Sequence, residues 1–400
     1  MTEALGRSQV LPYVFGLAKS GVEMEVLSFE PQGTSDLELQ KTRELLRDQG
    51  VRWFPQVRSP RHDLATKVRE SFGASLAGLA RALRRFPRVV HARSYIPAAV
   101  ADLIATITPG SKLLFDCRGM LGDEYVDAGH WSRDQVSYKA LKRVEKRLFR
   151  RAEGLVVLTH ALRDWLMQNV EVRRDVELSV IPCCVDLEKF GGSVEARNLA
   201  RKKLGIGDDE LLVTYSGSLG TWYMEREMAA FFAHVRRGYP AAKFLLLSRS
   251  PTDGFVKALA EEGIPASDVI VRGVSPDDMP ALLPAGDLGV SFIKPCFSKV
   301  GSSPTKVAEY LSSGMPVVVN ANIGDQRDLA PETSGVVVTE DFSKESLAAV
   351  AIPALALARR PFVERAAAAR DVARKHFGLA ELGVPKYQAL YRALDSKRVS

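Results

Sequence analysis

The stretch Ser302–Asn320 reads SSPTKVAEYLSSGMPVVVN. It begins with small polar residues, continues with a helix-forming segment and ends in a β-branched run. Pro304 presets the backbone for a first helical turn, and Gly314 is typical of the end of a helix. The β-branched run after Pro316 has the pattern of a buried strand. The stretch therefore predicts a loop, a short helix and a strand, in that order.

The start of the predicted helix has the chemistry of an anion site. Its first backbone N–H groups have no partner within the helix, its dipole is positive at this end, and the ammonium group of Lys306 is nearby. These features favour a phosphate. A carboxylate one turn further on, at Glu309, would instead accept hydrogen bonds from a diol such as the ribose of a nucleotide. The alternative is that Ser303 is an ordinary N-cap and Glu309 a solvated helix residue.

Length and composition limit the class of protein. A chain of 400 residues with 46% hydrophobic residues predicts two domains of ordinary size. No apolar run is long enough to span a membrane and no signal-peptide pattern opens the sequence, so we expect a cytoplasmic protein. The four cysteines, and also His130 and His160, match no disulfide or metal-ligand spacing, so we expect no metal site.

The charge of the chain points to anionic partners. A net charge of +7 and a pI near 9.2 come with acidic residues scattered among the basic ones. This moderate excess favours anionic ligands or an anionic membrane surface over sequence-specific reading of DNA. We therefore expect no nucleic-acid partner.

Predicted strands alternate with predicted helices along the whole chain. In the first half they are expected at 23–29, 51–57, 88–91, 112–116, 154–159 and 178–182. In the second half they are expected at 211–216, 243–248, 268–272, 287–292, 315–319 and 335–338. This alternation predicts an α/β fold with doubly wound parallel sheets, in which ligands bind at the carboxyl ends of the strands.

The composition loosens around residues 191–193, which suggests a domain boundary. We expect an N-terminal Rossmann-like domain over 1–188 and a C-terminal one over 189–380, with a cleft between them. Residues 381–400 contain a helical pattern with one apolar face. That face would pack against another element, and the first domain is the candidate.

The first domain lacks one expected strand. A doubly wound domain of this type places its first strand at the centre of the sheet, yet no strand precedes Leu5. Its neighbours would keep unpaired buried backbone groups, which a marginally stable domain does not tolerate. We therefore expect that the natural chain begins upstream of Met1, or that another segment fills the gap.

Several further stretches follow one family pattern in their order and spacing. They are LGRSQVLPY at 5–13, LSFE at 27–30, HARS at 91–94, FDCRG at 115–119, VIP at 180–182 with VD at 185–186, and YSGSLG at 215–220. Together with Ser302–Asn320 they resemble the retaining nucleotide-sugar glycosyltransferases of family 4. The resemblance implies a GT-B fold of two facing Rossmann-like domains, with the acceptor on the first domain and the nucleotide sugar mainly on the second. It also implies that no metal or other cofactor is needed.

The same resemblance suggests roles on the donor side. Glu309 matches the glutamate that binds ribose, and the residues from Ser303 through Pro304 and Thr305 to Lys306 match the turn that holds the diphosphate. Gly6 matches a glycine loop whose backbone approaches the diphosphate and sugar.

The sequence departs from the family pattern at two positions. Gly301 stands eight residues before Glu309, where many members carry a second glutamate, and Ser218, after Gly217, stands where an arginine is expected. The diphosphate charge must then be neutralised by Lys306, Arg249 or Arg226, and we favour Lys306 because it adjoins the helix start.

Polar residues also follow two predicted strands of the first domain. They are His91, Arg93 and Ser94 after one strand, Asp116 and Arg118 after the next, and Glu124 in the following loop. The arginines could hold a phosphate or carboxylate, and Asp116 could orient the acceptor hydroxyl. The alternatives are a structural Asp116–Arg118 pair, a core histidine at 91 and a solvated loop at Asp123.

Residues 138–151 form a predicted basic amphipathic helix, with seven basic residues in fourteen. Such a helix could lie on anionic lipid at the inner face of the membrane and bring the enzyme to a lipid-linked acceptor. The alternative is that its apolar face packs on the sheet and its charges are solvated.

The sequence thus predicts a retaining glycosyltransferase that moves a sugar from a nucleotide-diphosphate donor to a saccharide or lipid-linked acceptor, in polysaccharide or glycoconjugate biosynthesis. Lys306 would neutralise the leaving group, with Asp116, Arg118 and His91 as further catalytic candidates. The alternatives are a nucleotide-sugar epimerase or hydrolase on the same fold, and a nucleotide-binding relative without activity.

Overall fold

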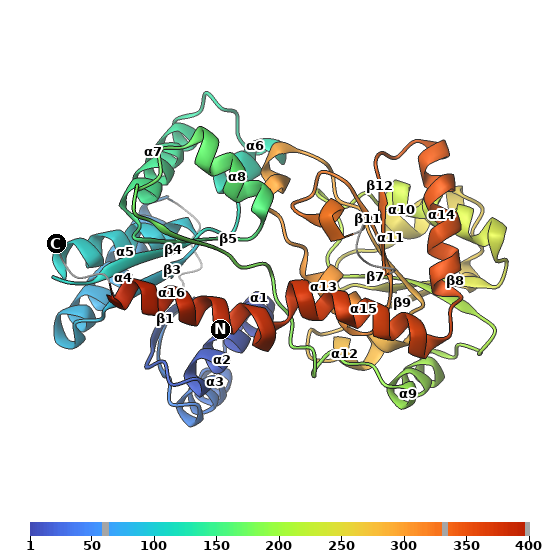
Figure 1. Cartoon of the computed structure of the whole chain (residues 1–400), viewed down its shortest axis with the longest axis horizontal. Helices are drawn as coiled ribbons and strands as arrows, with labels where there is room; N and C mark the ends of the chain where they lie inside the picture. The colour runs from blue at the N-terminus through green and yellow to red at the C-terminus, as the bar shows by residue number, and fades with distance from the viewer. Residues whose placement is uncertain (58–63, 330–334, 397–400) are drawn as a thin grey trace. The chain divides into compact units, whose positions relative to one another are not determined.

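The computed structural model describes residues 1–57, 64–329 and 335–396, and it divides the chain into two compact units (Figure 1). The first unit is Met1–Pro182 with Leu379–Ser400, and the second is Cys183–Gly378. Both divisions lie a few residues before the predicted boundaries at 188 and 380. The reason is that the N–H of Val185 donates to the carbonyl of Phe377 at 2.8 Å, which ties the segment after Pro182 to the second unit.

The first unit alternates strands and helices as predicted. Its elements are α1 (Ala4–Gln9), α2 (Leu11–Lys19), β1 (Glu25–Glu30), α3 (Asp36–Asp48), β2 (Arg52–Val57), α4 (Leu64–Arg85), β3 (Val89–Arg93), α5 (Tyr95–Ile107), β4 (Lys112–Asp116), α6 (Leu121–Asp127), α7 (Val136–Arg151), β5 (Gly154–Val157), α8 (His160–Asn169), β6 (Glu177–Val180) and α16 (Val384–Ser396). All strand pairs are parallel, which confirms the predicted α/β class.

The strands of the first unit form two sheets. β1 pairs with β2, and a separate sheet has the order β3-β4-β5-β6. In the described part of the chain, β1 pairs only with β2, and β3 pairs only with β4. The strand expected at the centre of this domain is therefore not supplied by a described segment.

Helix α16 packs on the first unit. In Figure 1 it is the red helix beside β3, and it contacts α2, β3 and β6. Tyr387 and Leu394 on its apolar face are buried, and Leu394 packs against the backbone of Gly154 at the start of β5. Arg88 and Asp395 form an ion pair at 2.5 Å near the end of the helix.

The second unit contains one six-stranded parallel sheet. Its main elements are α9 (Val194–Leu204), β7 (Leu211–Ser216), α10 (Glu225–Gly238), β8 (Ala242–Leu247), α11 (Asp253–Glu261), β9 (Val269–Arg272), α12 (Met279–Leu282), β10 (Leu288–Ser291), α13 (Thr305–Ser312), β11 (Val317–Asn320), β12 (Val336–Thr339), α14 (Lys344–Ala358) and α15 (Phe362–Phe377). The strand order is β12-β11-β10-β7-β8-β9, so the chain changes direction across the sheet between β7 and β10. In open α/β sheets such a switch point opens a ligand crevice at the carboxyl ends of the strands.

Both faces of this sheet are covered by apolar helix faces. One core cluster joins α9, α13 and α15 to the sheet, and the other joins α10, α11 and α14. The strands are continuous apolar runs, as expected when both faces are buried, and Val317–Val319 are fully buried. No single described helix is long and apolar enough to cross a membrane; α14 and α15 reach that length and composition only together, across a bend of 113°.

The close approach of α13 to the sheet gives a first prediction. A Cβ atom on Gly289 of β10 would lie 2.4 Å from the ring of Tyr310, so Gly289→Ala should lower the free energy of unfolding by about 1–3 kcal/mol. Gly273→Ala is the control, because its nearest neighbour would be 3.9 Å away. Urea unfolding measures both variants, and equal stabilities would contradict the packing described.

Candidate functional site

Lys306, the second residue of α13, reaches back to the end of β7. Its Nζ donates to the hydroxyl of Tyr215 at 2.8 Å and lies 4.0 Å and 3.8 Å from the ring centroids of Tyr215 and Tyr223. Gly217, directly after β7, has a φ of +111°, and a Cβ there would lie 3.2 Å from the Lys306 Nζ. Because of both its backbone conformation and this contact, position 217 favours glycine. The structure therefore brings Lys306 and Gly217 together at the switch point of the sheet.

The ammonium group of Lys306 is buried without a paired carboxylate. Lys306 is only 8% exposed, and no described carboxylate lies within ion-pair distance of its Nζ. Burial lowers the pKa of Lys306 well below its usual value, and the charge of Glu309 opposes that shift. A buried cation held mainly by aromatic faces and one hydroxyl gains more from an anionic ligand than a solvated lysine does. This arrangement is suited to bind a phosphate.

Glu309 lies one turn further along α13 and remains partly exposed. Burial raises its pKa to about 7, while the charges of Lys306 and Lys189 pull the pKa down. The next residue, Tyr310, accepts a hydrogen bond from the backbone N–H of Ser216 at 2.6 Å, which fixes the end of β7 against α13. This hydrogen bond fixes the position on the sheet of the helix that carries Glu309.

The loop before α13 differs in detail from the prediction. Pro304, not Ser303, is the N-cap residue of α13, and no side chain caps this helix. The hydroxyl of Ser303 instead accepts a hydrogen bond from the backbone N–H of Cys183 at 3.1 Å. The interpretation of Ser303 as an ordinary N-cap is therefore wrong. Although the N–H of Val307 donates to the carbonyl of Pro304 at 3.0 Å, the start of α13 has no side-chain cap and keeps the polarity that suits an anion.

The loop after β7 is held by three hydrogen bonds. The N–H of Gly220 donates to the Glu225 carboxylate at 3.0 Å, and the N–H of Leu219 donates to the Ser250 hydroxyl at 3.3 Å. The carbonyl of Ser218 accepts from the Tyr215 hydroxyl. These bonds set the position of the Gly217–Gly220 backbone beside Lys306.

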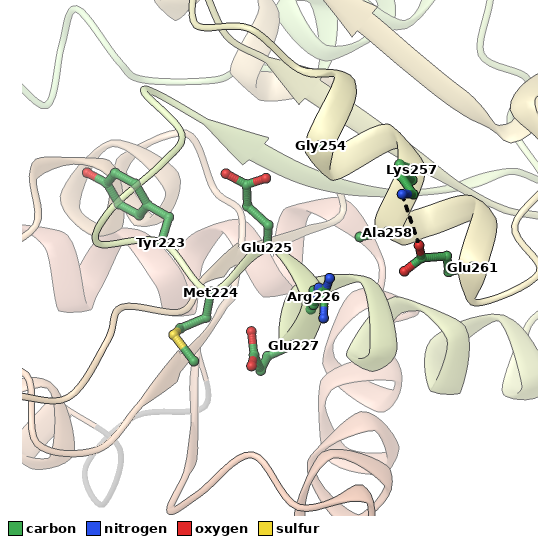
Figure 2. Close-up of a pocket in the computed structure, with 9 residues that line it drawn as sticks. All are labelled: Tyr223, Met224, Glu225, Arg226, Glu227, Gly254, Lys257, Ala258 and Glu261. Carbon is green, nitrogen blue, oxygen red and sulfur yellow. Dashed lines mark ion pairs between the residues drawn. The ribbon is translucent and has the colours of Figure 1, made fainter.

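The two arginines considered as alternatives to Lys306 for neutralising the diphosphate, Arg249 and Arg226, have exposed side chains. Arg249 directly precedes Ser250 at the end of β8. Arg226 lies in the first turn of α10 and lines a pocket of about 410 Å³ between α10 and α11 (Figure 2). The pocket is lined by Tyr223, Met224, Glu225, Arg226, Glu227, Gly254, Lys257, Ala258 and Glu261. Its three carboxylates outnumber its two basic groups, and Lys257 is paired with Glu261, so it is a poor site for a diphosphate.

In the first unit, the predicted polar residues gather around one buried carboxylate. Asp116 is 1% exposed and accepts a hydrogen bond from Tyr387 of α16 at 3.0 Å. Its oxygens lie 3.4 Å from Arg118, 3.7 Å from Arg93 and 3.9 Å from His91. Although burial alone would raise the pKa of Asp116, Arg118, His91 and Arg93 together hold it well below its usual value. A carboxylate in this state is a weak base, so the site favours a structural Asp116–Arg118 pair over acid–base chemistry at Asp116.

His91 is not a core histidine. Its side chain is partly exposed, and its Nδ1 lies 2.7 Å from the hydroxyl of Tyr391 on α16. The neighbouring Ser94 has a φ of +71°, which is rare for a residue other than glycine, and its N–H donates to the carbonyl of Asp116 at 2.9 Å. Helix α16 therefore supplies two tyrosines to a cluster that sequence patterns assigned to the strand ends alone.

The loop after β4 also departs from the prediction. Asp123 is buried, accepting from the Tyr138 hydroxyl at 3.0 Å and from Lys142 at 3.1 Å, so its interpretation as a solvated loop residue is wrong. Glu124 packs over Gly119, with its Oε1 3.2 Å from the position of a Cβ there. The carboxylate of Glu124 thus lies against the turn that follows Asp116.

Gly6 does not lie in a glycine loop. It is inside helix α1, and a Cβ there would lie 2.8 Å from the Cα of Met1. The glycine allows close packing of two backbone segments. The expected turn at this position is corrected to a helix.

The basic helix α7 is largely neutralised by neighbouring acids. Five of the seven basic residues counted over 138–151 form ion pairs with carboxylates: Lys139, Lys142, Arg147, Arg150 and Arg151. Asp102, which is 4% exposed, forms ion pairs with both Arg147 and Arg151. This pairing accounts for much of the charge that suggested a lipid surface.

Sequence reasoning missed the aromatic groups of both sites. Tyr215 and Tyr223 face Lys306, and Tyr387 binds Asp116. Tyr215 was visible as the first residue of the YSGSLG stretch, but its contact with Lys306 depends on the packing of α13. Among the residues described, no group of three or more His, Cys, Asp or Glu is placed to hold a metal ion.

Comparisons with known proteins agree with this architecture. The family model described as Glycosyltransferase Family 4 matches residues 12–189. TuaC of Bacillus subtilis (strain 168), a proposed teichuronic acid biosynthesis glycosyltransferase, is 24% identical over 234 residues, which cover 58% of this chain and 53% of TuaC. The match therefore spans about half the length of that relative.

Solved structures match over nearly the whole chain. Sucrose-phosphate synthase from Thermosynechococcus elongatus aligns with a TM-score of 0.71 at 16% identity, covering 96% of this chain and 91% of the synthase. Anabaena HepE in complex with UDP and glucose aligns with a TM-score of 0.67 at 16% identity, covering 96% of this chain and 95% of HepE. These matches confirm the GT-B fold, built from two Rossmann-like units. The match to the family model over residues 12–189, together with the similarity to TuaC, agrees with the resemblance to the family 4 glycosyltransferases.

The raised pKa of Glu309 gives a second prediction. Between pH 4.5 and about 7 the folded protein holds the Glu309 proton while the unfolded chain releases it, so this residue makes stability fall as pH rises through that window. Glu309→Gln should remove the fall and gain on the order of 2 kcal/mol relative to wild type between pH 4.5 and pH 8.

Urea unfolding at both pH values measures this difference. Glu345→Gln, at an exposed position of α14, is the matched control. Parallel pH profiles for wild type and Glu309→Gln would contradict the environment described for Glu309.

Proposed function

We propose that this protein is a glycosyltransferase that uses a nucleotide-diphosphate sugar as donor. The observation that carries the proposal is the buried ammonium of Lys306, which lies at the uncapped start of α13 and pairs with no carboxylate in the described part of the chain. The resemblance to family 4 and the fold shared with HepE, whose structure contains UDP and glucose, support it.

The proposed donor site uses α13 and the loop after β7. The first N–H groups of α13 and the Lys306 ammonium bind the diphosphate, and the Gly217–Gly220 backbone lies beside them. Glu309, in its ionised form, accepts hydrogen bonds from the ribose diol. Charge on the diphosphate would return the pKa of Lys306 toward its usual value, because an adjacent anion stabilises the ammonium.

The reaction that fits these groups retains the configuration of the sugar and needs no metal. Cleavage of the bond between the anomeric carbon and the phosphate oxygen leaves negative charge on the diphosphate, which Lys306 and α13 stabilise. The acceptor oxygen bonds to the anomeric carbon on the same face, and its proton passes to the departing phosphate oxygen. No carboxylate nucleophile is required, in keeping with Gly301 and with the fully engaged carboxylate of Asp116.

The acceptor is proposed to be a saccharide or a lipid-linked saccharide bound on the first unit. Arg93 and Arg118 are the candidate contacts for an anionic group on the acceptor, and Asp116 acts as the positioning residue that orients them. Ser94 and Glu124 adjoin the same turn. Peripheral binding to anionic lipid through residues 138–151 stays a prediction, and the ion pairs of α7 weaken its physical basis.

A binding measurement tests the donor site without knowledge of the acceptor. Lys306→Met keeps the length of the side chain but removes its charge, so the affinity for UDP should fall about ten- to hundredfold. The affinity for uridine, which has no phosphate, should stay unchanged. Isothermal titration calorimetry measures both ligands.

The control is Lys257→Met, at a position that is 79% exposed on α11. Equal losses of UDP and uridine affinity would point to a folding defect, which circular dichroism detects. Unchanged UDP affinity would remove Lys306 from the site. Binding of UDP without sugar transfer to any cell-extract acceptor would favour the inactive relative, and turnover of donor without acceptor would favour the epimerase or hydrolase.

A further inference from the structure

A second pocket lies in the first unit, at the amino ends of β1 and β2. It has a volume of about 390 Å³ and is lined by Glu25, Arg52, Phe54, Ala77, Ala80, Arg81, Arg84 and Arg85. Glu25 and Arg52 are the first residues of the two strands and lie opposite each other in the parallel register. The other lining residues, apart from Phe54 of β2, come from the last nine residues of α4. The site residues of this unit instead follow the carboxyl ends of β3 and β4, so the pocket is a separate feature.

The lining is strongly basic. Four guanidinium groups face one carboxylate, a formal excess of three positive charges. The carboxylate of Glu25 lies 2.8 Å from Arg52, 3.5 Å from Arg85 and 4.0 Å from Arg81, so three arginines share it. Outside the pocket lining, the exposed carboxylate of Glu23 also pairs with Arg52 at 3.3 Å. Two carboxylates still leave an excess of two positive charges among the four arginines, and like charges repel one another. An anion with more than one negative charge would relieve that repulsion.

The arginines are arranged around a partly apolar surface. The guanidinium carbon of Arg81 lies 3.0 Å from the ring centroid of Phe54, which limits the orientations of its planar group. Ala77 and Ala80 have small side chains, which leave room between the helix and the strands. Arg84 forms no ion pair with any residue that the structure describes. Its fork of N–H donors is therefore available to a ligand.

The dipole at the carboxyl end of α4 does not by itself account for this cluster of arginines. Basic residues in the last turn of a helix stabilise its negative dipole end, and Arg84 and Arg85 fit that pattern. Arg52, however, belongs to β2, and the helix dipole does not explain a pocket between α4 and the strands. A volume of this size falls in the range of small-molecule sites.

We propose that this pocket binds a phosphorylated small molecule or headgroup that carries at least two negative charges. Arginine forks match phosphate oxygens in paired hydrogen bonds, and several forks around one pocket select multiply charged groups over single ones. Binding here is independent of the donor site proposed for the second unit. The proposal therefore stands or falls separately from the glycosyltransferase assignment.

Pyrophosphate is the probe, and the donor site must first be weakened because it would bind the same ion. In the Lys306→Met background, where the donor site binds about ten- to hundredfold more weakly, calorimetry at fixed ionic strength should show one remaining tight pyrophosphate site. Arg81→Ala and Arg84→Ala should each weaken that site about tenfold, and Arg84→Lys should give an intermediate loss because it keeps the charge but not the fork. Arg47→Ala is the matched control, since Arg47 is an exposed arginine on α3 of the same unit, and should change nothing.

Three results would overturn the proposal: no pyrophosphate site in the Lys306→Met protein, equal affinity in the Arg84→Ala variant, or an equal loss in Arg47→Ala. Circular dichroism checks folding, and Arg84→Lys keeps the test valid if an alanine variant unfolds. Vesicles of phosphatidylcholine with phosphatidic acid identify the source of the phosphate. Vesicle binding that pyrophosphate displaces and Arg84→Ala loses indicates a lipid headgroup, whereas pyrophosphate binding without vesicle binding indicates a soluble ligand.

Discussion

Burial of the Lys306 ammonium is offset in this protein by two aromatic faces and one hydroxyl rather than by a carboxylate. Removing an ammonium from water is costly, and cation–π contacts recover only part of that cost. The group is therefore most stable when an anion is also present. Three features favour an anion next to the Lys306 nitrogen. Gly217 leaves space there, and the uncapped start of α13 and the loop after β7 place polar backbone groups beside it.

The topology of the second unit decides where that nitrogen lies. β7 and β10 are neighbours although two strands, β8 and β9, lie between them in the sequence, and the crevice at their carboxyl ends is the switch point of the sheet. Gly289 lets the ring of Tyr310 pack directly on β10, and the Tyr310 hydroxyl holds the backbone of Ser216. The helix that carries Lys306 and Glu309 is thus locked to the strand that carries Tyr215.

Local patterns predicted the strands well, because each buried parallel strand is an apolar run between polar turns. They also predicted a helix that carries Lys306 and Glu309, and the structure has both residues on α13, whereas their roles stay proposals. They failed where a distant segment decides the environment. The resemblance put Gly6 in a glycine loop, but Gly6 packs on Met1 inside a helix. Asp123 looked solvated but is bound by Tyr138 and Lys142 of α7. On α16, Tyr387 is 271 residues from Asp116 in sequence and Tyr391 is 300 residues from His91, so no local pattern could place them there.

The central claim is that a nucleoside diphosphate binds between the loop after β7 and the start of α13. Hydrogen exchange with mass spectrometry, on the full chain with and without UDP, tests it most directly because exchange reports on backbone N–H groups peptide by peptide. The account predicts slower exchange in peptides that cover 216–220 and 303–310 when UDP is bound. Protection confined to other segments, with both of these unchanged at saturating UDP, would contradict it.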